Sequence, residues 1–312
     1  MPEARDLHVD TTLTNLSVQY RNEEMIWRDI LPEVKVNKRS DLYWKYAKDN
    51  QFRNYDDKIG PRSMANEIDF AVGTDNYSVK DHALSDWVGQ EEIDNADSPL
   101  APESDSNDQI NSSLDLAQEL RVAALAFVAA TYPSGNKVTL AGATQWTGAS
   151  DNPIKDVQDA VEGCFVRANT LVFGIEAWLV FRRLPEILDA VKAIAGTSLA
   201  GGLATPSAVA NLFEVDRILI GRGRYISTKE GQTSTYARIW GKHMAALYIK
   251  PGEVGVRGIT FGKTFVETKR MTMRSFDEKR GLKGAHYIKT GWNSDEKIVA
   301  SDLGYFIENA VA

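Results

Sequence analysis

The residues whose types and spacing could bind a phosphate lie in ILIGRGRYISTKEG, residues 218–231. A short apolar run leads there into Gly221 and Gly223, and an arginine follows each glycine. Glycine-rich loops that follow a strand can hold nucleotide phosphates with their backbone N–H groups. A dinucleotide loop also needs a third glycine, at the position of Ile226, and then a helix, whereas RYISTKEGQTS is rich in turn and extended-chain residues. The glycine pair therefore predicts a turn at the end of a strand.

A second phosphate-binding pattern occurs in GVRGITFGKTF, where Gly262, Lys263 and Thr264 match the end of a P-loop. The first glycine of that motif falls on Arg257, and FVETKRMTMR, which follows, has the pattern of a strand instead of the required helix. We therefore reject nucleotide hydrolysis. An enzyme that binds a nucleotide at Gly221 or Gly262 stays as an alternative of another class.

Metal-binding and nucleophilic patterns are weak in this sequence. Cys164 is the only cysteine, which excludes an intrachain disulfide and a zinc site made of cysteines. It lies on the apolar face of a helix predicted from residue 152, where a buried, inert thiol is expected. The histidines are far apart and have no second ligand at metal-binding spacing: His8, His82, His243 and His286. We predict no catalytic residue, no cofactor, no metal site and no enzyme.

Composition sets the limits within which these residues act. The chain has 312 residues, 43% of them hydrophobic, which is enough for two globular parts or for one with long extensions. Its net charge of −7 argues against a protein that mainly grips nucleic-acid phosphates, so any such contact should be local or weak. The longest apolar run, residues 122–130, is too short to span a bilayer. We expect a soluble chain made in a reducing compartment, with no membrane contact.

The N-terminal third consists mainly of extended segments. Alternating aromatic and polar residues in DLYWKYA and in EIDFAVGTDNYSVKDHALS predict two strands, and the polar stretch between them, with Gly60-Pro61 at its centre, predicts a long excursion with a polar tip. Residues 90–108 then carry seven acidic residues and no basic one, as a solvated linker would. Ile110, Leu114, Ala117, Ala124 and Val128 have helical spacing and predict a long helix from about residue 106 to about residue 130.

The second half alternates helices and strands and ends in a basic tail. Segments such as NTLVFG, DRILIG and AALYIK predict strands between helices, and hence a small mixed sheet with helices on its faces. Residues 257–312 predict a long hairpin, and residues 257–289 hold nine basic and three acidic residues. This tail and the acidic linker could match within one chain or between neighbouring subunits. Large aromatic residues on segments that would not fold alone suggest cover by partner subunits: Trp27, Tyr43, Trp44, Tyr46, Trp87, Tyr287, Trp292 and Tyr305.

The order of these parts resembles the major capsid protein of tailed bacteriophages, with the Hong-Kong-97-type fold. The similar phrases are spread over most of the chain: LTNLSVQYRNEEMIWRDILPEVKVNKRSDLYWKYAKDNQFR, NADSPL, RANTLVFGIEAWLVFRRLPEILDAVK, LFEVDRILIGRGRY, IWGKHMAALYIKP and DLGYFIENAV. The resemblance implies an α+β fold in five parts: an N-terminal arm over 1–40, an E-loop excursion over 41–90, a peripheral domain with linker and spine helix over 91–150, an α/β axial domain over 151–250, and a peripheral β-hairpin with the C-terminus over 251–312.

The implied function is a shell subunit that assembles with itself into pentamers and hexamers of an icosahedral capsid around double-stranded DNA. Portal, scaffolding and decoration proteins are the further partners implied, with weak non-specific contact to the packaged DNA, in a virion assembled in the bacterial host cytoplasm. An encapsulin-like compartment that encloses protein cargo is the alternative of the same fold. Hinges are expected near Gly60-Pro61 and in the loop 196–206, and subunit contacts at Arg222 and Arg224.

Some relatives join their subunits through a lysine-asparagine bond assisted by a carboxylate. Here Lys58 could supply the lysine and Asn293 or Asn309 the asparagine. A lysine at a polar loop tip is usually only solvated, so we expect no covalent link.

Overall fold

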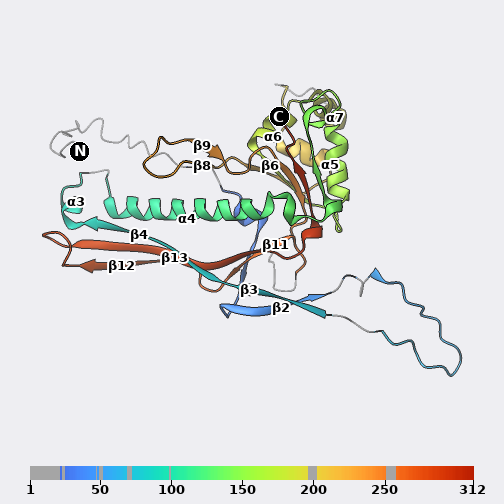
Figure 1. The fold of residues 1–312 in the computed structure, drawn as a ribbon, viewed down its shortest axis with the longest axis horizontal. Helices are drawn as coiled ribbons and strands as arrows, with labels where there is room; N and C mark the ends of the chain where they lie inside the picture. The colour runs from blue at the N-terminus through green and yellow to red at the C-terminus, as the bar shows by residue number, and fades with distance from the viewer. Residues whose placement is uncertain are drawn as a thin grey trace.

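The computed structural model describes residues 22, 25–46, 48, 52–68, 72–97, 100–195, 202–250 and 258–312. Two five-stranded sheets and one long helix organise this part of the chain, and a long loop stands away from them (Figure 1). No helix among these residues is both long and apolar enough to cross a membrane. Most of the expected arm, part of the expected hinge at 196–206, His8 and Arg257 lie outside the described residues.

The first sheet forms the α/β part expected from the alternating pattern. Its strands run in the order β5 (Lys137–Thr139), β14 (Gly304–Glu308), β10 (Met244–Leu247), β6 (Thr170–Gly174) and β7 (Arg217–Gly221). Four helices accompany it: α5 (Pro153–Glu162), α6 (Ile175–Phe181), α7 (Pro185–Ala195) and α8 (Pro206–Leu212). Two of the strands come from outside the range 151–250 expected for the axial domain, because β14 pairs antiparallel with the central strand β10 and β5 pairs with β14.

Aromatic packing fills the core of this α/β part. Trp146, Phe173, Trp178 and Phe181 are fully buried and contact one another, with ring centroids 5.0–6.4 Å apart. Such pairs add to the free energy gained by burying apolar area. These contacts join β6 to helix α6.

The second sheet lies against the long helix α4 (Pro102–Ala126). Its order is β1 (Glu33–Lys35), β11 (Gly262–Val266), β13 (Ala285–Ile298) and β12 (Met271–Asp277), and β4 (Lys80–Gly89) also pairs with β13. Helix α4 runs along this sheet in Figure 1. The expected hairpin of the tail is thus formed by β12 and β13. Ten antiparallel residue pairs also join β13 to β4, the strand that precedes α4 in the chain.

The start and the buried face of α4 correct the expectation from spacing. The helix begins at Pro102, where a proline fits because its missing N–H is not needed in the first turn. Ile110 and Leu114 are buried as predicted, whereas Ala124 and Val128 are exposed. The buried stripe also includes two polar residues that the apolar pattern passed over, Gln118 and Glu119. The acidic segment expected as a linker contains a short helix, α3 (Gln90–Asp94).

The excursion is a two-stranded ladder that ends in a loop. Strands β2 (Ser40–Tyr46) and β3 (Val72–Ser78) pair antiparallel, and residues 53–68 beyond them contain no helix or strand (Figure 1). We call residues 53–68 the excursion loop. The remaining elements are short: α1 (Trp27–Ile30), the hairpin of β8 (Arg224–Ile226) and β9 (Tyr236–Arg238), and the 3₁₀ turns η2 (Ala129–Thr131), η3 (Ser134–Asn136), η4 (Gly142–Thr144) and η5 (Ser301–Leu303).

Candidate interaction surfaces

Gly221 and Gly223, the glycine pair that could have bound a phosphate, instead allow neighbouring side chains to pack closely against the backbone. Gly221 is the last residue of β7, and a Cβ atom there would lie 2.1 Å from Cδ1 of Trp240. At Gly223 a Cβ would lie 2.9 Å from Cδ1 of Ile239. Only glycine fits at position 221, because the indole of Trp240 packs directly against the end of β7. A nucleotide site would need a helix after this loop, but strand β8 follows instead.

The two arginines beside these glycines are exposed on or next to the β8–β9 hairpin. The backbone N–H of Arg224 donates to Oδ1 of Asn22 at 3.2 Å, and its carbonyl accepts from Nδ2 of the same residue at 2.8 Å. The carbonyl of Arg222 accepts from Nη1 of Arg238 at 2.7 Å. The hairpin is thus tied to the N-terminal segment.

The P-loop-like residues lie in the buried strand β11. Lys263 is buried, and burial together with the charge of Lys250 lowers its pKa to about 8. The hydroxyl of Thr264 donates to the carbonyl of Leu31 at 3.0 Å. A central strand has no loop of free N–H groups, so this segment cannot cradle a phosphate.

Cys164 and the three histidines that the structure describes, His82, His243 and His286, do not form a metal-binding group. Burial raises the pKa of the Cys164 thiol to about 12, so the thiol stays protonated and unreactive. Nδ1 of His243 accepts from the N–H of Asn309 at 3.0 Å, while Nε2 of His286 lies 3.0 Å from Oε1 of Gln90. Among the residues that the structure describes, no three His, Cys, Asp or Glu side chains group closely enough to hold a metal ion.

Several large aromatic residues are covered by their own chain, which corrects the expectation of partner cover. Trp27, Tyr43 and Trp292 are only 2%, 7% and 9% exposed. Trp27 packs on Trp292 beneath α4, with ring centroids 6.2 Å apart, and Tyr43 packs on Phe265 at 5.6 Å. Trp87, Tyr287 and Tyr305 are half-buried, and the side chains of Trp44 and Tyr46 lie outside the described set.

Exposed aliphatic side chains are concentrated on the projecting parts. On the excursion loop Met64 is 90% exposed, and Ile59 and Ile68 are also open to solvent. Leu282, at the tip of the β12–β13 hairpin, is 91% exposed, and Met271 and Met273 are exposed at the start of β12, away from the tip. Such apolar groups gathered on projections indicate surfaces that another chain covers.

The buried carboxylate of Glu119 joins three parts of the chain, and the sequence patterns missed it. Its oxygens accept the backbone N–H groups of Ile26 at 3.1 Å and Trp27 at 2.9 Å and the indole N–H of Trp240 at 2.6 Å. Burial raises the pKa of Glu119, and these three hydrogen bonds act in the opposite direction. Residues 119 and 118 follow Leu114 at helical spacing and precede Val122, which is the signal that could have placed them on the buried face.

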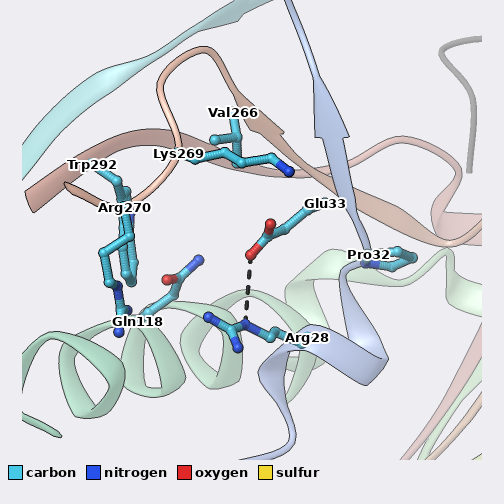
Figure 2. A pocket seen from close by; sticks show the side chains of 8 residues that line it. All are labelled: Arg28, Pro32, Glu33, Gln118, Val266, Lys269, Arg270 and Trp292. Carbon is cyan, nitrogen blue, oxygen red and sulfur yellow. Dashed lines mark ion pairs between the residues drawn. The ribbon is translucent and has the colours of Figure 1, made fainter. Parts of the chain in front are cut away.

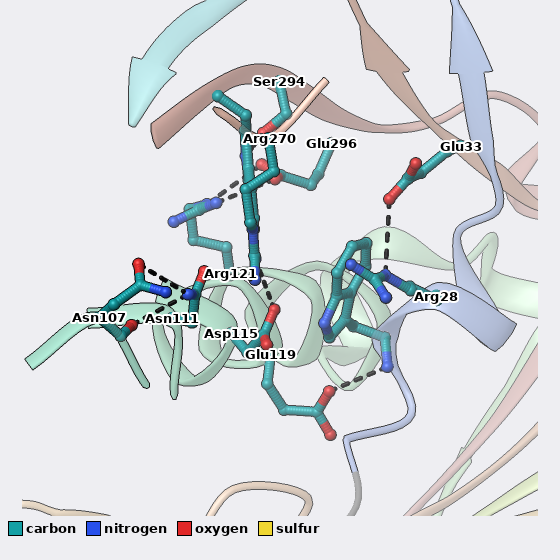
Figure 3. A network of polar contacts seen from close by, with 12 residues as sticks. Arg28, Glu33, Asn107, Asn111, Asp115, Glu119, Arg121, Arg270, Ser294 and Glu296 are labelled. Carbon is teal, nitrogen blue, oxygen red and sulfur yellow. Dashed lines mark hydrogen bonds and ion pairs between the residues drawn. The ribbon is translucent and has the colours of Figure 1, made fainter. Parts of the chain in front are cut away.

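A paired charge network lies on the neighbouring turns of α4 (Figure 3). Arg121 donates to both carboxylate oxygens of Glu296, at 3.0 and 3.2 Å, and the Glu296 side chain is 7% exposed. Burial raises the pKa of Glu296, but hydrogen bonds and charge from Arg121 outweigh it and hold the pKa below its usual value. Nη2 of Arg270 donates to Oδ1 of Asp115 at 2.6 Å. These pairs fix β13 and the connection from β11 to β12 to α4.

A pocket of about 520 Å³ lies beside this network (Figure 2). Residues from α1, β1, α4, β11, the connection from β11 to β12, and β13 line it: Arg28, Pro32, Glu33, Gln118, Val266, Lys269, Arg270 and Trp292. Arg28 and Glu33 form an ion pair at 3.5 Å across one side, and the guanidinium of Arg270 lies 3.7 Å from the ring centroid of Trp292 on the other. We call this cavity the Gln118 pocket.

The residues considered for a covalent link are not equivalent. Lys58 is exposed on the excursion loop, whereas Asn293 is 8% exposed within β13. The Asn293 carboxamide is engaged at both ends, because Nδ2 donates to Oε2 of Glu267 at 2.8 Å and Oδ1 accepts from the N–H of Thr268 at 2.6 Å.

Comparison with known proteins gives one consistent group. No family model matches the chain. It is 33% identical over 304 residues to the major capsid protein of Pseudomonas phage JBD67, covering 97% of both chains, and 27% identical to that of Burkholderia phage BcepMu, covering 77% of this chain and 76% of the relative.

Solved structures agree with this arrangement of elements. A phage-related protein of Bordetella bronchiseptica matches with a TM-score of 0.69 at 23% identity, covering 93% of each chain. The capsid of cyanophage P-SCSP1u matches with 0.65 at 10% identity, covering 97% of this chain and 93% of that chain, and the capsid of phage XM1 with 0.56 at 14%, covering 97% of each. At these identities the structures establish the fold alone.

Proposed function

Since the chain belongs to the major capsid proteins of tailed phages and has their Hong-Kong-97-like fold, we propose that copies of it assemble into the icosahedral shell around a double-stranded DNA genome. The observation that carries this proposal beyond family membership is the exposed apolar surface of the excursion loop and of the β12–β13 tip. The exposed apolar side chains on these projections are not buried by their own chain. In a closed shell, neighbouring copies would bury them at every repeated contact.

The parts then take the following places in the shell. The α/β part lies around the five-fold and six-fold positions, so that one sequence forms both pentamers and hexamers, and the second sheet with α4 joins neighbouring capsomers. The loop near Gly60-Pro61 bends to fit both surroundings, and the exposed Arg222 and Arg224 meet polar groups of the next subunit in the ring. The net charge of −7 suits a container that holds DNA through weak contacts only.

The wider assembly follows from the same role. A portal, a scaffolding protein and decoration proteins are its further partners, and assembly takes place in the host cytoplasm. No arrangement in the described residues favours an enzyme, because the glycine segments form packed strands and no three His, Cys, Asp or Glu side chains there group closely enough to hold a metal ion. The curated relatives are phage major capsid proteins, which favours the phage shell over a cargo-enclosing compartment.

Electron microscopy of the expressed chain tests the proposal. Closed icosahedral shells are expected, and charge reversal at the exposed Arg224 should lower their yield while an alanine at exposed Lys229 leaves it unchanged. A stable monomer at concentrations where relatives form shells would contradict the proposed function.

A further inference from the structure

The ring of His243 makes a hydrogen bond that only its unprotonated form can make. The residue directly precedes β10, and its Nδ1 atom lies 3.0 Å from the backbone nitrogen of Asn309, directly after β14. A backbone N–H only donates, so Nδ1 must present its lone pair, and the proton of the neutral ring is on Nε2. An imidazolium carries an N–H at both positions and would set two donors against each other. Adding one proton to His243 therefore breaks this bond.

The surroundings of His243 favour the neutral ring. Its centroid lies 5.5 Å from that of Phe306 in β14 and 6.3 Å from that of Phe127 at the end of α4. Burial lowers the pKa of His243, and the carboxylates of Glu308 on β14 and Glu176 on α6 act in the opposite direction without outweighing it. The folded chain therefore holds this ring neutral at pH values where a free histidine is partly charged.

The Asn309 N–H belongs to a series of hydrogen bonds that hold residues 309–312, which we call the C-terminal segment. The N–H of Ala310 donates to the carbonyl of Lys242 at 3.0 Å, and Nζ of Lys242 donates to the carbonyl of Ala312 at 2.7 Å. Asn309 has a φ of 53°, in the left-handed region, so the chain turns sharply where the segment begins. The segment is thus fastened to the two residues that precede β10.

The C-terminal segment in turn holds the loop that carries Trp146. The N–H of Trp146 donates to the carbonyl of Ala310 at 2.9 Å. Nε2 of the adjacent Gln145 donates to the carbonyls of Asn309 and Val311, at 3.1 and 3.0 Å. Trp146, Ala310 and Val311 are buried in the same hydrophobic cluster of the α/β part. Release of the segment would therefore uncover one side of this core.

We propose that His243 is an acid-sensitive fastener, whose protonation releases the C-terminal segment from the α/β part and loosens the Trp146 side of the core. One proton from solvent adds to Nδ1, and the hydrogen bond from the Asn309 N–H is lost. The pKa of the folded ring lies below the ordinary value of 6.5, so this fastening is at full strength above pH 6.5 and weakens as the pH falls toward the folded value. The population of released segments should rise by at most about tenfold per pH unit over that interval. The device acts within a single chain and does not depend on the proposed shell function.

Hydrogen exchange of the unassembled chain at pH 7 and pH 5, corrected for the intrinsic exchange rate at each pH, tests the proposal. In the wild type, protection of the amides of residues 309–312 and of Trp146 should be at least several-fold lower at pH 5. His243→Asn can place its carboxamide oxygen near the position of Nδ1 and does not titrate, so its protection should be equal at the two pH values. His286→Gln is the matched control, because His286 lies on β13 of the second sheet, and it should keep the wild-type fall.

Equal protection of the wild type at both pH values would overturn the proposal. An equal fall in His243→Asn would overturn it too, because the acid effect would then belong to another group. A second measurement needs no variant: the ring of His243, followed by NMR in the wild type, should titrate below pH 6.5 together with the amide signal of Asn309. A ring that titrates while the Asn309 amide stays unchanged would show that protonation does not release the segment.

Discussion

The indole N–H of Trp240 donates to the carboxylate of Glu119 at 2.6 Å, and both side chains are buried. This bond joins the α/β part of the molecule to the helix on which the second sheet rests. The same carboxylate accepts the N–H groups of Ile26 and Trp27, so it also holds the start of α1. One side chain therefore sets the relation of three segments that are far apart in sequence.

Glu119→Gln should lower the free energy of unfolding by about 1–3 kcal/mol, because the new NH₂ group faces N–H donors that then lack an acceptor. The measurement is denaturant unfolding of the unassembled chain. Glu186→Gln, on the exposed face of α7, is the control and should stay within about 0.5 kcal/mol of the wild type. Equal effects of the two changes would refute the junction role of Glu119.

Arg121→Met should be more damaging, because it leaves the carboxylate of Glu296 buried without its cation. Breaking such a pair costs about 3–5 kcal/mol, whereas replacing both partners by apolar groups is often nearly neutral. The double variant Arg121→Met with Glu296→Met should therefore recover most of the loss. A double variant as unstable as Arg121→Met alone would show that the pair is not the cause.

The same pair predicts a pH dependence. The pKa of Glu296 is lowered in the folded chain, so its contribution to stability is present above the unfolded value of 4.5 and is lost as the pH falls through the folded value. In Arg121→Met the burial of Glu296 acts without the opposing charge of Arg121, which should raise the pKa of Glu296. The direction in which Glu296 changes stability with pH should then be reversed. The gap in unfolding free energy between wild type and variant should widen from pH 4 to pH 7, and a constant gap would contradict this assignment.

Gly221→Ala should destabilise the chain by about 1–3 kcal/mol, because the added methyl group meets the Trp240 ring. Gly135→Ala should be nearly neutral, since nothing lies within 4 Å of a Cβ at that position. The midpoints of thermal unfolding check the comparison. Nucleotide binding should be undetectable in both variants and in the wild type, and saturable ATP or NAD binding would reopen the enzyme alternative.

Wild-type shells boiled in denaturant should give only monomer-sized chains. The carboxamide of Asn293 is buried and hydrogen-bonded at both its oxygen and its nitrogen, which leaves no free approach for a lysine. A ladder of linked chains would contradict this, and its loss in Lys58→Ala would then identify the lysine.

The elements that the sequence predicts well are those whose pattern is local. Strands β6, β7 and β10 and the helix begun by Pro153 follow from short apolar runs and a proline at a helix start. Apolar spacing correctly placed Ile110 and Leu114 on the buried face of α4. It passed over Gln118 and Glu119 because they are polar, and the partners that bury them, from α1, the Trp240 segment and the pocket wall, are not near in sequence. The prediction that a partner subunit covers Trp27 failed for the same reason, because Trp27 packs on Trp292, which lies near the other end of the chain.

The parallel pairing of β1 with β11 has a consequence for synthesis. Val34 pairs with Phe265, so a strand made early waits for a partner made more than two hundred residues later, which takes on the order of tens of seconds at translation rates of about 5–20 residues per second. The β1 edge and the wall of the Gln118 pocket are incomplete during that interval. This part of the second sheet therefore forms only in chains that the ribosome has translated past β13.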